Sequence, residues 1–349
     1  MWNMRRCLGA VWMTCIACYV EPSPPILTNL AFVTSQSIQP GSFTSVDSAD
    51  AFCNESAVAA HLPGHYVAWM SSSTESALSR LGTHARGWVR VDGKPFADRA
   101  TDLAAGRMFY PLRIDENGQD VVSATVPNPP VATGTNPDGT VSFNCSDFTD
   151  SGSGIAVGFA DATTAVWTEY TMAPCTQDFR LYCLGIDANG AITPADAGKT
   201  AFLSSEAFTP GGGLASADQI CSGEAAAHGV AGTYGALLAT TGSTAIARFA
   251  PAAGERWVRP DHVTITDGLS ELAAPCNVTL DLTYAGNDIT WSGGAGINGP
   301  GTAATTCDDW SSSINDGIAG RTSSTGTDAL AVTATATCTQ STPVYCFEM

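Results

Sequence analysis

Positive charge is scarce in this sequence. Lysine occurs only at Lys94 and Lys199, and 15 Lys and Arg residues stand against 33 Asp and Glu residues, so the formal net charge is −18. A chain of this charge repels phosphate and sulfate. It therefore lacks the electrostatic attraction on which binding to nucleic acid, heparin-like polyanions and anionic membrane surfaces depends. The composition excludes a nucleic-acid-binding role and favours a neutral or basic partner.

Long apolar runs are also lacking. No segment approaches the ~18 uninterrupted apolar residues expected of a membrane-spanning helix. The run at residues 7–17 is shorter and follows an Arg-Arg pair, a pattern typical of an export signal. It ends in Cys-Ile-Ala-Cys at residues 15–18, which resembles the lipobox of bacterial lipoproteins. The resemblance implies that a signal peptide, residues 1–17, is removed and that Cys18 is acylated. Plain secretion after the same cleavage is the alternative.

Export would place the folded part of the chain outside the cytoplasm. Residues 18–29 contain a Pro-Ser-Pro-Pro segment, a stiff spacer that would hold the following domains away from a membrane to which Cys18 is anchored. We therefore expect a lipid-anchored protein of the outer membrane or cell surface, or else a secreted protein.

The chain contains an internal repeat. Ser-Ala-Asp-Ala-Phe-Cys at residues 48–53 is matched by Ser-Ala-Asp-Gln-Ile-Cys at residues 216–221, and a Trp-Val-Arg segment also occurs twice. The ends of the two copies match as well, since each closes on an apolar-Tyr-Cys-apolar segment. The sequence therefore predicts two tandem domains, residues 30–186 and 200–349, joined by a polar linker at residues 187–199.

Each repeat is expected to open with an amphipathic helix. Apolar residues recur at i, i+3, i+4 and i+8 in both copies and place a cysteine on the apolar face. Gly64 and Gly232 are expected to end these helices, because glycine is favoured just after a helix C-terminus. Short apolar segments at 66–70 and 234–238 predict buried strands, and the hydroxyls near Ser72 predict the start of a second helix. The residues of the two apolar faces are Ala49, Phe52, Cys53, Ala57, Ala217, Ile220, Cys221 and Ala225.

Eight cysteines form two matching quartets. In an exported chain such quartets indicate a disulfide framework, and sequence alone allows three pairings in each. Zinc binding is the alternative, although neither CxxC spacing nor a histidine cluster accompanies the cysteines. Cys276 has no counterpart in the first repeat and is expected to be a buried free thiol or a bridge to another chain. The quartets are Cys53, Cys145, Cys175 and Cys183, and Cys221, Cys307, Cys338 and Cys346.

Several of these motifs together resemble a known family. They are the opening helix with its cysteine, His-Gly-Val-Ala-Gly-Thr-Tyr at residues 228–234, the inner Cys-x-Asp-Phe/Trp and the closing Tyr-Cys-Phe-Glu. These motifs are similar to those of the endostatin domain and of its bacterial relatives, which are surface lipoproteins of a domain family of unknown function. Those domains are similar in fold to C-type lectins. The resemblance covers nearly all of both repeats.

The resemblance implies a fold and a disulfide pairing. Each domain would be an α+β, C-type-lectin-like unit with two helices, a twisted antiparallel sheet, neighbouring termini and long loops stapled by disulfides. The pairing would be nested, so that one bridge ties the first helix to the last strand and the other closes the loop region. The implied bridges are Cys53–Cys183, Cys145–Cys175, Cys221–Cys346 and Cys307–Cys338.

The metal-binding features of the related domains do not carry over. Neither Glu-Pro-Asn nor Gln-Pro-Asp nor Trp-Asn-Asp, the calcium motifs of sugar-binding C-type lectins, occurs in the chain. No histidines match the zinc site of endostatin, so we expect no metal and no cofactor. His61 and His228 take equivalent places near the ends of the opening helices, where a histidine compensates the helix dipole or is solvated.

Two aspartates are the candidate residues of a ligand surface. Asp147 and Asp309 each stand two residues after the inner cysteine, beside Phe148 and Trp310. The alternative is that each carboxylate accepts hydrogen bonds from nearby backbone amides. The long loops after the repeated Trp-Val-Arg segments are the other place where a rigid scaffold would display a contact surface.

The expected function is binding rather than catalysis. We expect a ligand-binding or adhesion module of the cell surface, with a protein or a glycan as its ligand. The alternatives are a structural component of the cell envelope without a soluble ligand and a cysteine-dependent enzyme that would use Cys276. The sequence leaves the ligand and the oligomeric state open.

Overall fold

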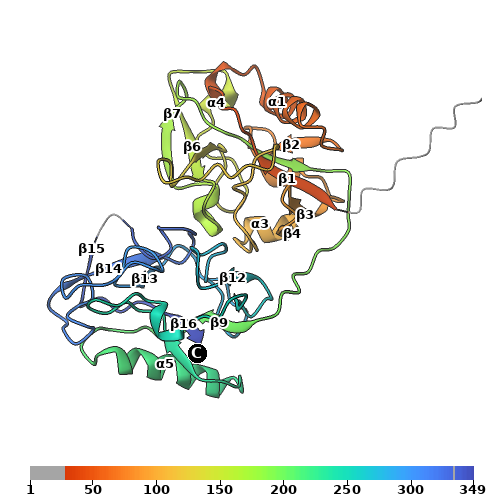
Figure 1. Cartoon of the computed structure of the whole chain (residues 1–349). Helices are drawn as coiled ribbons and strands as arrows, with labels where there is room; N and C mark the ends of the chain where they lie inside the picture. Colours follow the sequence, from red (N-terminus) through yellow and green to blue (C-terminus); the bar gives the residue numbers. More distant parts are fainter. Residues whose placement is uncertain (1–27, 333–334) are drawn as a thin grey trace, which may run out of the picture.

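Two similar α+β halves make up the computed structural model, which describes residues 28–332 and 335–349 (Figure 1). The expected signal peptide and Cys18 lie outside the described residues, as does nearly all of the expected spacer. Within the described residues, no helix is long and apolar enough to cross a membrane.

The first half is built on a five-stranded sheet of order β2-β8-β1-β3-β4. Strand β1 pairs antiparallel with β8 and parallel with β3, so the sheet is mixed, and the antiparallel sheet expected from the resemblance is wrong in this respect. The parallel pair is possible because the long segment between β1 and β3 forms the crossover that such a pair needs. The strands are β1 Asn29–Val33, β2 Tyr66–Ala68, β3 Arg86–Arg90, β4 Pro95–Arg99 and β8 Tyr182–Gly185.

The second half repeats this arrangement in the order β10-β16-β9-β11-β12. Here β9 pairs parallel with β11 and antiparallel with β16. Each half also has a smaller three-stranded sheet. The strands of the large sheet are β9 Lys199–Leu203, β10 Tyr234–Ala236, β11 Trp257–Val258, β12 Thr264–Thr266 and β16 Tyr345–Glu348. Those of the small sheets are β5 Pro130–Ala132, β6 Gly154–Phe159, β7 Thr171–Pro174, β13 Ile289–Trp291, β14 Asp316–Arg321 and β15 Thr335–Thr337.

One long helix packs against each large sheet, as the apolar spacing predicts. These are α1 Val46–Ala59 and α5 Leu214–Ala227, and each buries two alanines and the cysteine of its predicted face. Phe52 and Ile220 are partly buried beside them. The buried residues of the two faces are Ala49, Cys53 and Ala57, and Ala217, Cys221 and Ala225.

Both helices end earlier than Gly64 and Gly232, so those glycines are not the terminating residues. The left-handed position that follows α1 is filled by His61, with φ 57°, and the position that follows α5 by Gly229, with φ 66°. In each case the amide of the following residue donates back to a carbonyl of the last helical turn. Leu62 donates to the Ala57 carbonyl (2.9 Å) and Val230 to the Ala225 carbonyl (2.9 Å). The two histidines are therefore one position apart rather than equivalent.

The predicted second helix is present only as a short turn. In the first half α2 spans Ala77–Arg80 and is capped by Ser76, which accepts a hydrogen bond from the Ser79 amide. Its counterpart in the second half is the 3₁₀ turn η3 Ala247–Phe249, so α5 is the one α-helix among the described residues of that half. Two helices per half is therefore a wrong prediction there. The remaining short elements are η1 Pro40–Ser42, α3 Ala100–Ala104, α4 Cys145–Phe148 and η2 Thr164–Trp167.

Four disulfides tie these elements together in the nested pairing that the resemblance implies. In each half one bridge joins the long helix to the last strand of the large sheet, and the other closes a loop of the small sheet. By the chain-entropy estimate each bridge stabilises its half by about 3 to 5 kcal/mol. The bridges are Cys53–Cys183, Cys145–Cys175, Cys221–Cys346 and Cys307–Cys338.

The two halves contact each other directly. The Thr163 amide donates to the Ser323 carbonyl (2.8 Å), and Ala162 forms a β-bridge with Ser324. Near the linker, a small apolar cluster unites Tyr110 of the first half with residues of the second half, Val263 and Ala274. In Figure 1 the linker runs along one side of the molecule from the first half to the second.

Candidate functional site: a cleft between the two halves

The aromatic residues of the predicted ligand surface are core residues. Phe148 and Trp310 are 0% exposed and belong to the apolar cores of their halves. Phe148 packs edge-on against Phe43, and Trp310 against Phe208. Neither side chain can contact a ligand, so this part of the prediction is wrong. The spacing of these residues after a cysteine reflects core packing.

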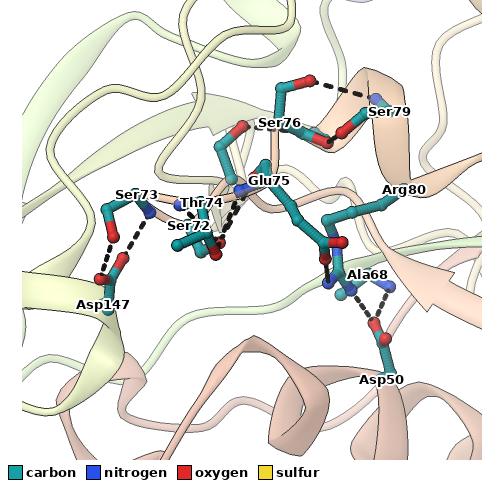
Figure 2. A network of polar contacts seen from close by, with 12 residues as sticks. Asp50, Ala68, Ser72, Ser73, Thr74, Glu75, Ser76, Ser79, Arg80 and Asp147 are labelled. Carbon is teal, nitrogen blue, oxygen red and sulfur yellow. Dashed lines mark hydrogen bonds and ion pairs between the residues drawn. The ribbon is translucent and has the colours of Figure 1, made fainter.

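The two aspartates serve the fold, as the alternative prediction stated. Asp147 accepts hydrogen bonds from the backbone amide of Ser73 (2.6 Å) and from its hydroxyl (2.5 Å) (Figure 2). It also accepts a hydrogen bond from the Asn144 side chain (2.9 Å). The Ser73 hydrogen bonds hold the pKa of Asp147 below its ordinary value. Asp309 accepts from the Thr241 amide in the same way (2.6 Å). Both carboxylates therefore join a loop to the turn that carries the inner cysteine.

That turn has an unusual backbone. All residues of α4 have positive φ, from 51° to 68°, and so do the equivalent residues 307–310, from 51° to 67°. Four consecutive non-glycine residues in the left-handed region form a left-handed turn, which L-amino acids disfavour. The same turn in both halves is therefore a built feature of the module. No signal in the Cys-x-Asp-Phe/Trp pattern predicts it.

A second repeated feature is an ion pair at the long helix. Asp50 lies 2.5 Å from Arg80 and accepts a hydrogen bond from the Ala68 amide (2.8 Å) (Figure 2). Asp218 pairs with Arg248 (2.6 Å) and accepts from the Ala236 amide (2.9 Å). Both residues of each pair recur in the sequence repeat, and that recurrence is a signal that could have predicted the contact.

A third repeated feature lies at the loop after the Trp-Val-Arg segment. Arg90 pairs with Asp92 (2.5 Å) and donates to the Pro111 carbonyl (2.8 Å). In the second half Arg259 pairs with Asp261 (2.6 Å) and donates to the Pro275 carbonyl (2.9 Å). The two loops named in the sequence analysis are thus held rigidly at their bases.

The unpaired cysteine occupies an apolar position. Cys276 directly follows the Pro275 carbonyl that Arg259 binds, and Leu112 directly follows the equivalent Pro111. Both side chains are buried, and Cys276 is 0% exposed in the core of the second half. Burial raises the pKa of the Cys276 thiol. Of the two predicted states, the structure shows the buried thiol, with no disulfide partner among the residues it describes.

A cleft lies where the two rigid loops meet the linker. Its volume is about 570 Å³, in the range of small-molecule sites in proteins. The first half contributes the turn after β3 and Tyr110, the second half contributes Arg256, Thr264 and Ala273, and residues 192–196 of the linker form the remaining wall. The cleft therefore exists only when both halves and the linker are in place.

Three charged groups set the electrostatics of the cleft. Lys94 and Arg256 line it and are exposed, and Asp196, which is half-buried, lies between the halves. Burial, followed by the charge of Arg90, lowers the pKa of Lys94. Burial alone would raise the pKa of Asp196, but hydrogen bonds from the Thr264 hydroxyl (2.6 Å) and amide (3.0 Å) hold it below its ordinary value.

The cleft has no constellation typical of a metal centre. Over the described part of the chain, no group of three or more His, Cys, Asp and Glu residues could hold a metal ion.

His228 lies at the end of α5, where its ring contacts the Glu224 carbonyl (2.9 Å) and Asp281 (3.0 Å). These two contacts raise the pKa of His228, which accords with its predicted role at the helix terminus.

Comparison with known proteins assigns no family, since no family model matches the chain and no curated protein matches it. The likeness to endostatin domains therefore remains a resemblance carried by the motifs.

Proposed function

We propose that the chain is an exported, lipid-anchored surface protein whose two halves bind a ligand in the cleft between them. The observation that carries the proposal is the composition of the cleft wall, which comes from both halves and from the linker. A wall shared by two rigid modules is a common setting for a ligand site. The expected anchor at Cys18 would display this cleft at the outer membrane or cell surface.

The disulfides support an extracytoplasmic location. Four bridges with ordinary Cα separations, 5.2 to 5.8 Å, form in the structure, and such bridges persist in oxidising compartments. A cysteine-dependent enzyme finds no support in residues 28–332 and 335–349, because the free thiol found there, at Cys276, is buried and its pKa is raised. A structural envelope component remains the alternative outcome of the test below.

The test is a binding screen with a variant that fills the cleft. The lipid-free chain, with Cys18→Ser, is screened against immobilised glycans and matrix proteins. We expect saturable binding to at least one of them, and loss of that binding in Ala195→Trp, since Ala195 is an exposed linker residue of the cleft wall. Ala59→Trp, at an exposed position near the end of α1, is the matched control. Binding that survives Ala195→Trp would contradict the cleft as the site, and no binding at all would favour an envelope component.

A further inference from the structure

Two cations of the cleft form no ion pair with an acid among the described residues, although Asp196 lies close enough for its charge to act with theirs. Lys94 and Arg256 line the same cavity, and the acids nearest to them in the sequence, Asp92 and Glu255, form ion pairs with other basic residues. Each of these acids is held by another basic residue at 2.5 to 2.7 Å. The pairs are Asp92 with Arg90 and Glu255 with Lys199.

The remaining acid of the cleft is occupied by hydrogen bonds. The Oδ2 atom of Asp196 accepts from both the amide and the hydroxyl of Thr264, and the Tyr110 hydroxyl lies 3.4 Å from the same atom. Asp196 therefore fastens the linker to β12. Two cations against one hydrogen-bonded carboxylate leave the cleft with a local excess of positive charge, in a chain whose net charge is −18.

The surroundings of Lys94 favour binding of an added negative charge. The Lys94 ammonium lies 5.0 Å from the centre of the Tyr110 ring, and Arg90 stacks on the same ring at 5.7 Å. Two cations on one aromatic ring repel each other, and this repulsion contributes to the lowered pKa of Lys94. An anion beside Lys94 would relieve it.

We infer that the cleft binds a small organic ligand through a single carboxylate held between Lys94 and Arg256. This inference rests on the proposed function and names the chemistry of its ligand. A polyanion is not expected, because the charge of the whole molecule repels it at a distance. One carboxylate suits the local excess of charge, and the apolar wall offers Val89, Pro95, Pro194 and Ala273 to the body of the ligand.

The first experiment compares an acid with a neutral molecule of the same shape. Isothermal titration of the lipid-free chain with sodium glucuronate should show binding, whereas glucose should show none under the same conditions. Raising the salt from ~50 mM to ~300 mM should weaken the binding, because both cations are exposed and are screened. Equal binding of glucuronate and glucose would overturn the inference. Inorganic phosphate is a third probe, and binding of phosphate tighter than that of glucuronate would contradict a carboxylate ligand.

Single substitutions test whether Lys94 and Arg256 supply the positive charge that binds the carboxylate. Lys94→Gln and Arg256→Gln should each weaken glucuronate binding about tenfold, the usual effect of removing a hydrogen bond to a charged group. Arg99→Gln is the control, since it removes one exposed positive charge outside this cleft, with Arg99 63% exposed. An equal loss in Arg99→Gln would show a general charge effect and would overturn the assignment.

The outcomes separate this inference from the proposed function. If a ligand found in the screen is lost in Ala195→Trp but unaffected by Lys94→Gln and Arg256→Gln, the cleft is the site and the carboxylate inference is wrong. If Ala195→Trp leaves all binding unchanged, the proposed function itself fails. Circular dichroism and a urea unfolding curve for each variant establish that the losses do not come from misfolding.

Discussion

A single carboxylate holds the long helix of each half against the strand that follows it. In the first half Asp50 bridges the Ala68 amide and Arg80, whose side chain is only 4% exposed. Burial raises the pKa of Asp50 in spite of the nearby arginine, which shows that desolvation offsets much of the attraction within the pair. Breaking such a pair is costly even where forming it contributes little, because the remaining charge stays buried without a partner.

We therefore expect Asp50→Asn to lower the free energy of unfolding by about 2 to 4 kcal/mol. Glu75→Gln is the matched control. Glu75 lies 3.8 Å from the same Arg80 but is 62% exposed, so its loss should change the free energy of unfolding by less than about 1 kcal/mol. Urea unfolding measures both values. Similar losses in the two variants would show that the burial of the Asp50 pair carries no special weight.

The left-handed turn of α4 carries a conformational cost at each of its residues. For L-residues the left-handed conformation costs about 1 to 2 kcal/mol each, and α4 has four of them in succession. Three contacts oppose this cost, namely the Cys145–Cys175 bridge, the buried ring of Phe148 and the hydrogen bonds between Asp147 and Ser73. The turn is therefore stable only within the folded module.

A glycine in this turn should stabilise the protein. Ser146 is exposed and has φ 51°, so Ser146→Gly removes strain without removing a buried group, and we expect a gain of up to about 1 kcal/mol in the free energy of unfolding. Ala51→Gly, at an exposed position inside α1, is the control and should cost about 1 kcal/mol. Both are measured by urea unfolding. Destabilisation by Ser146→Gly to the same extent as by Ala51→Gly would contradict a strained turn.

The same elements show what local sequence patterns can predict. The spacing of Ala49, Cys53 and Ala57 was enough for α1, because burial of one helix face leaves a periodic trace. The helix predicted to start near Ser72 does not start there, because the hydroxyls of Ser72 and Ser73 make other hydrogen bonds. The Ser72 hydroxyl accepts from the Glu75 amide, and the Ser73 hydroxyl donates to Asp147 (Figure 2). Serine favours such local hydrogen bonds as readily as a helix cap. The left-handed turn contains no glycine, so the sequence does not indicate its positive φ angles.

At the scale of the whole molecule, the repeat predicted two similar halves but not the site between them. The cleft depends on positions where the repeat breaks down. The Arg90 amide donates to the Lys94 carbonyl as the Arg259 amide donates to the Val263 carbonyl, so Lys94 and Val263 take equivalent positions. Val263 is nevertheless buried between the halves, whereas Lys94 lines the cleft. The linker residues have no counterpart at all. The internal repeat reveals only residues that occur in both halves. It therefore favoured Asp147 and Asp309 as ligand-surface residues, whereas their carboxylates hold loops of the fold.

The contact between the halves contains a buried acid. Asp161 is 3% exposed, and its Oδ1 atom has no hydrogen-bond partner among the described residues. Its backbone carbonyl accepts from the Thr325 hydroxyl of the second half (2.9 Å). The charged and titratable groups that face it are Asp328, Arg113 and Tyr182. Burial, and then the charge of Asp328, raise the pKa of Asp161 to about 7.

This acid should make stability depend on pH. An unfolded chain releases the Asp161 proton near pH 3.8, whereas the folded protein releases it near pH 7. The stability that the bound proton contributes is therefore complete below pH 3.8 and is lost as the pH rises through about 7. Asp161→Asn should therefore gain stability relative to the natural protein between about pH 4 and pH 7, reaching about 1 to 3 kcal/mol at pH 8. Urea unfolding at a series of pH values measures the difference. Asp328→Asn should reduce it, since it removes the charge that Asp161 faces across the interface. A difference between Asp161→Asn and the natural protein that stays constant over this range would show that Asp161 ionises normally in the folded state.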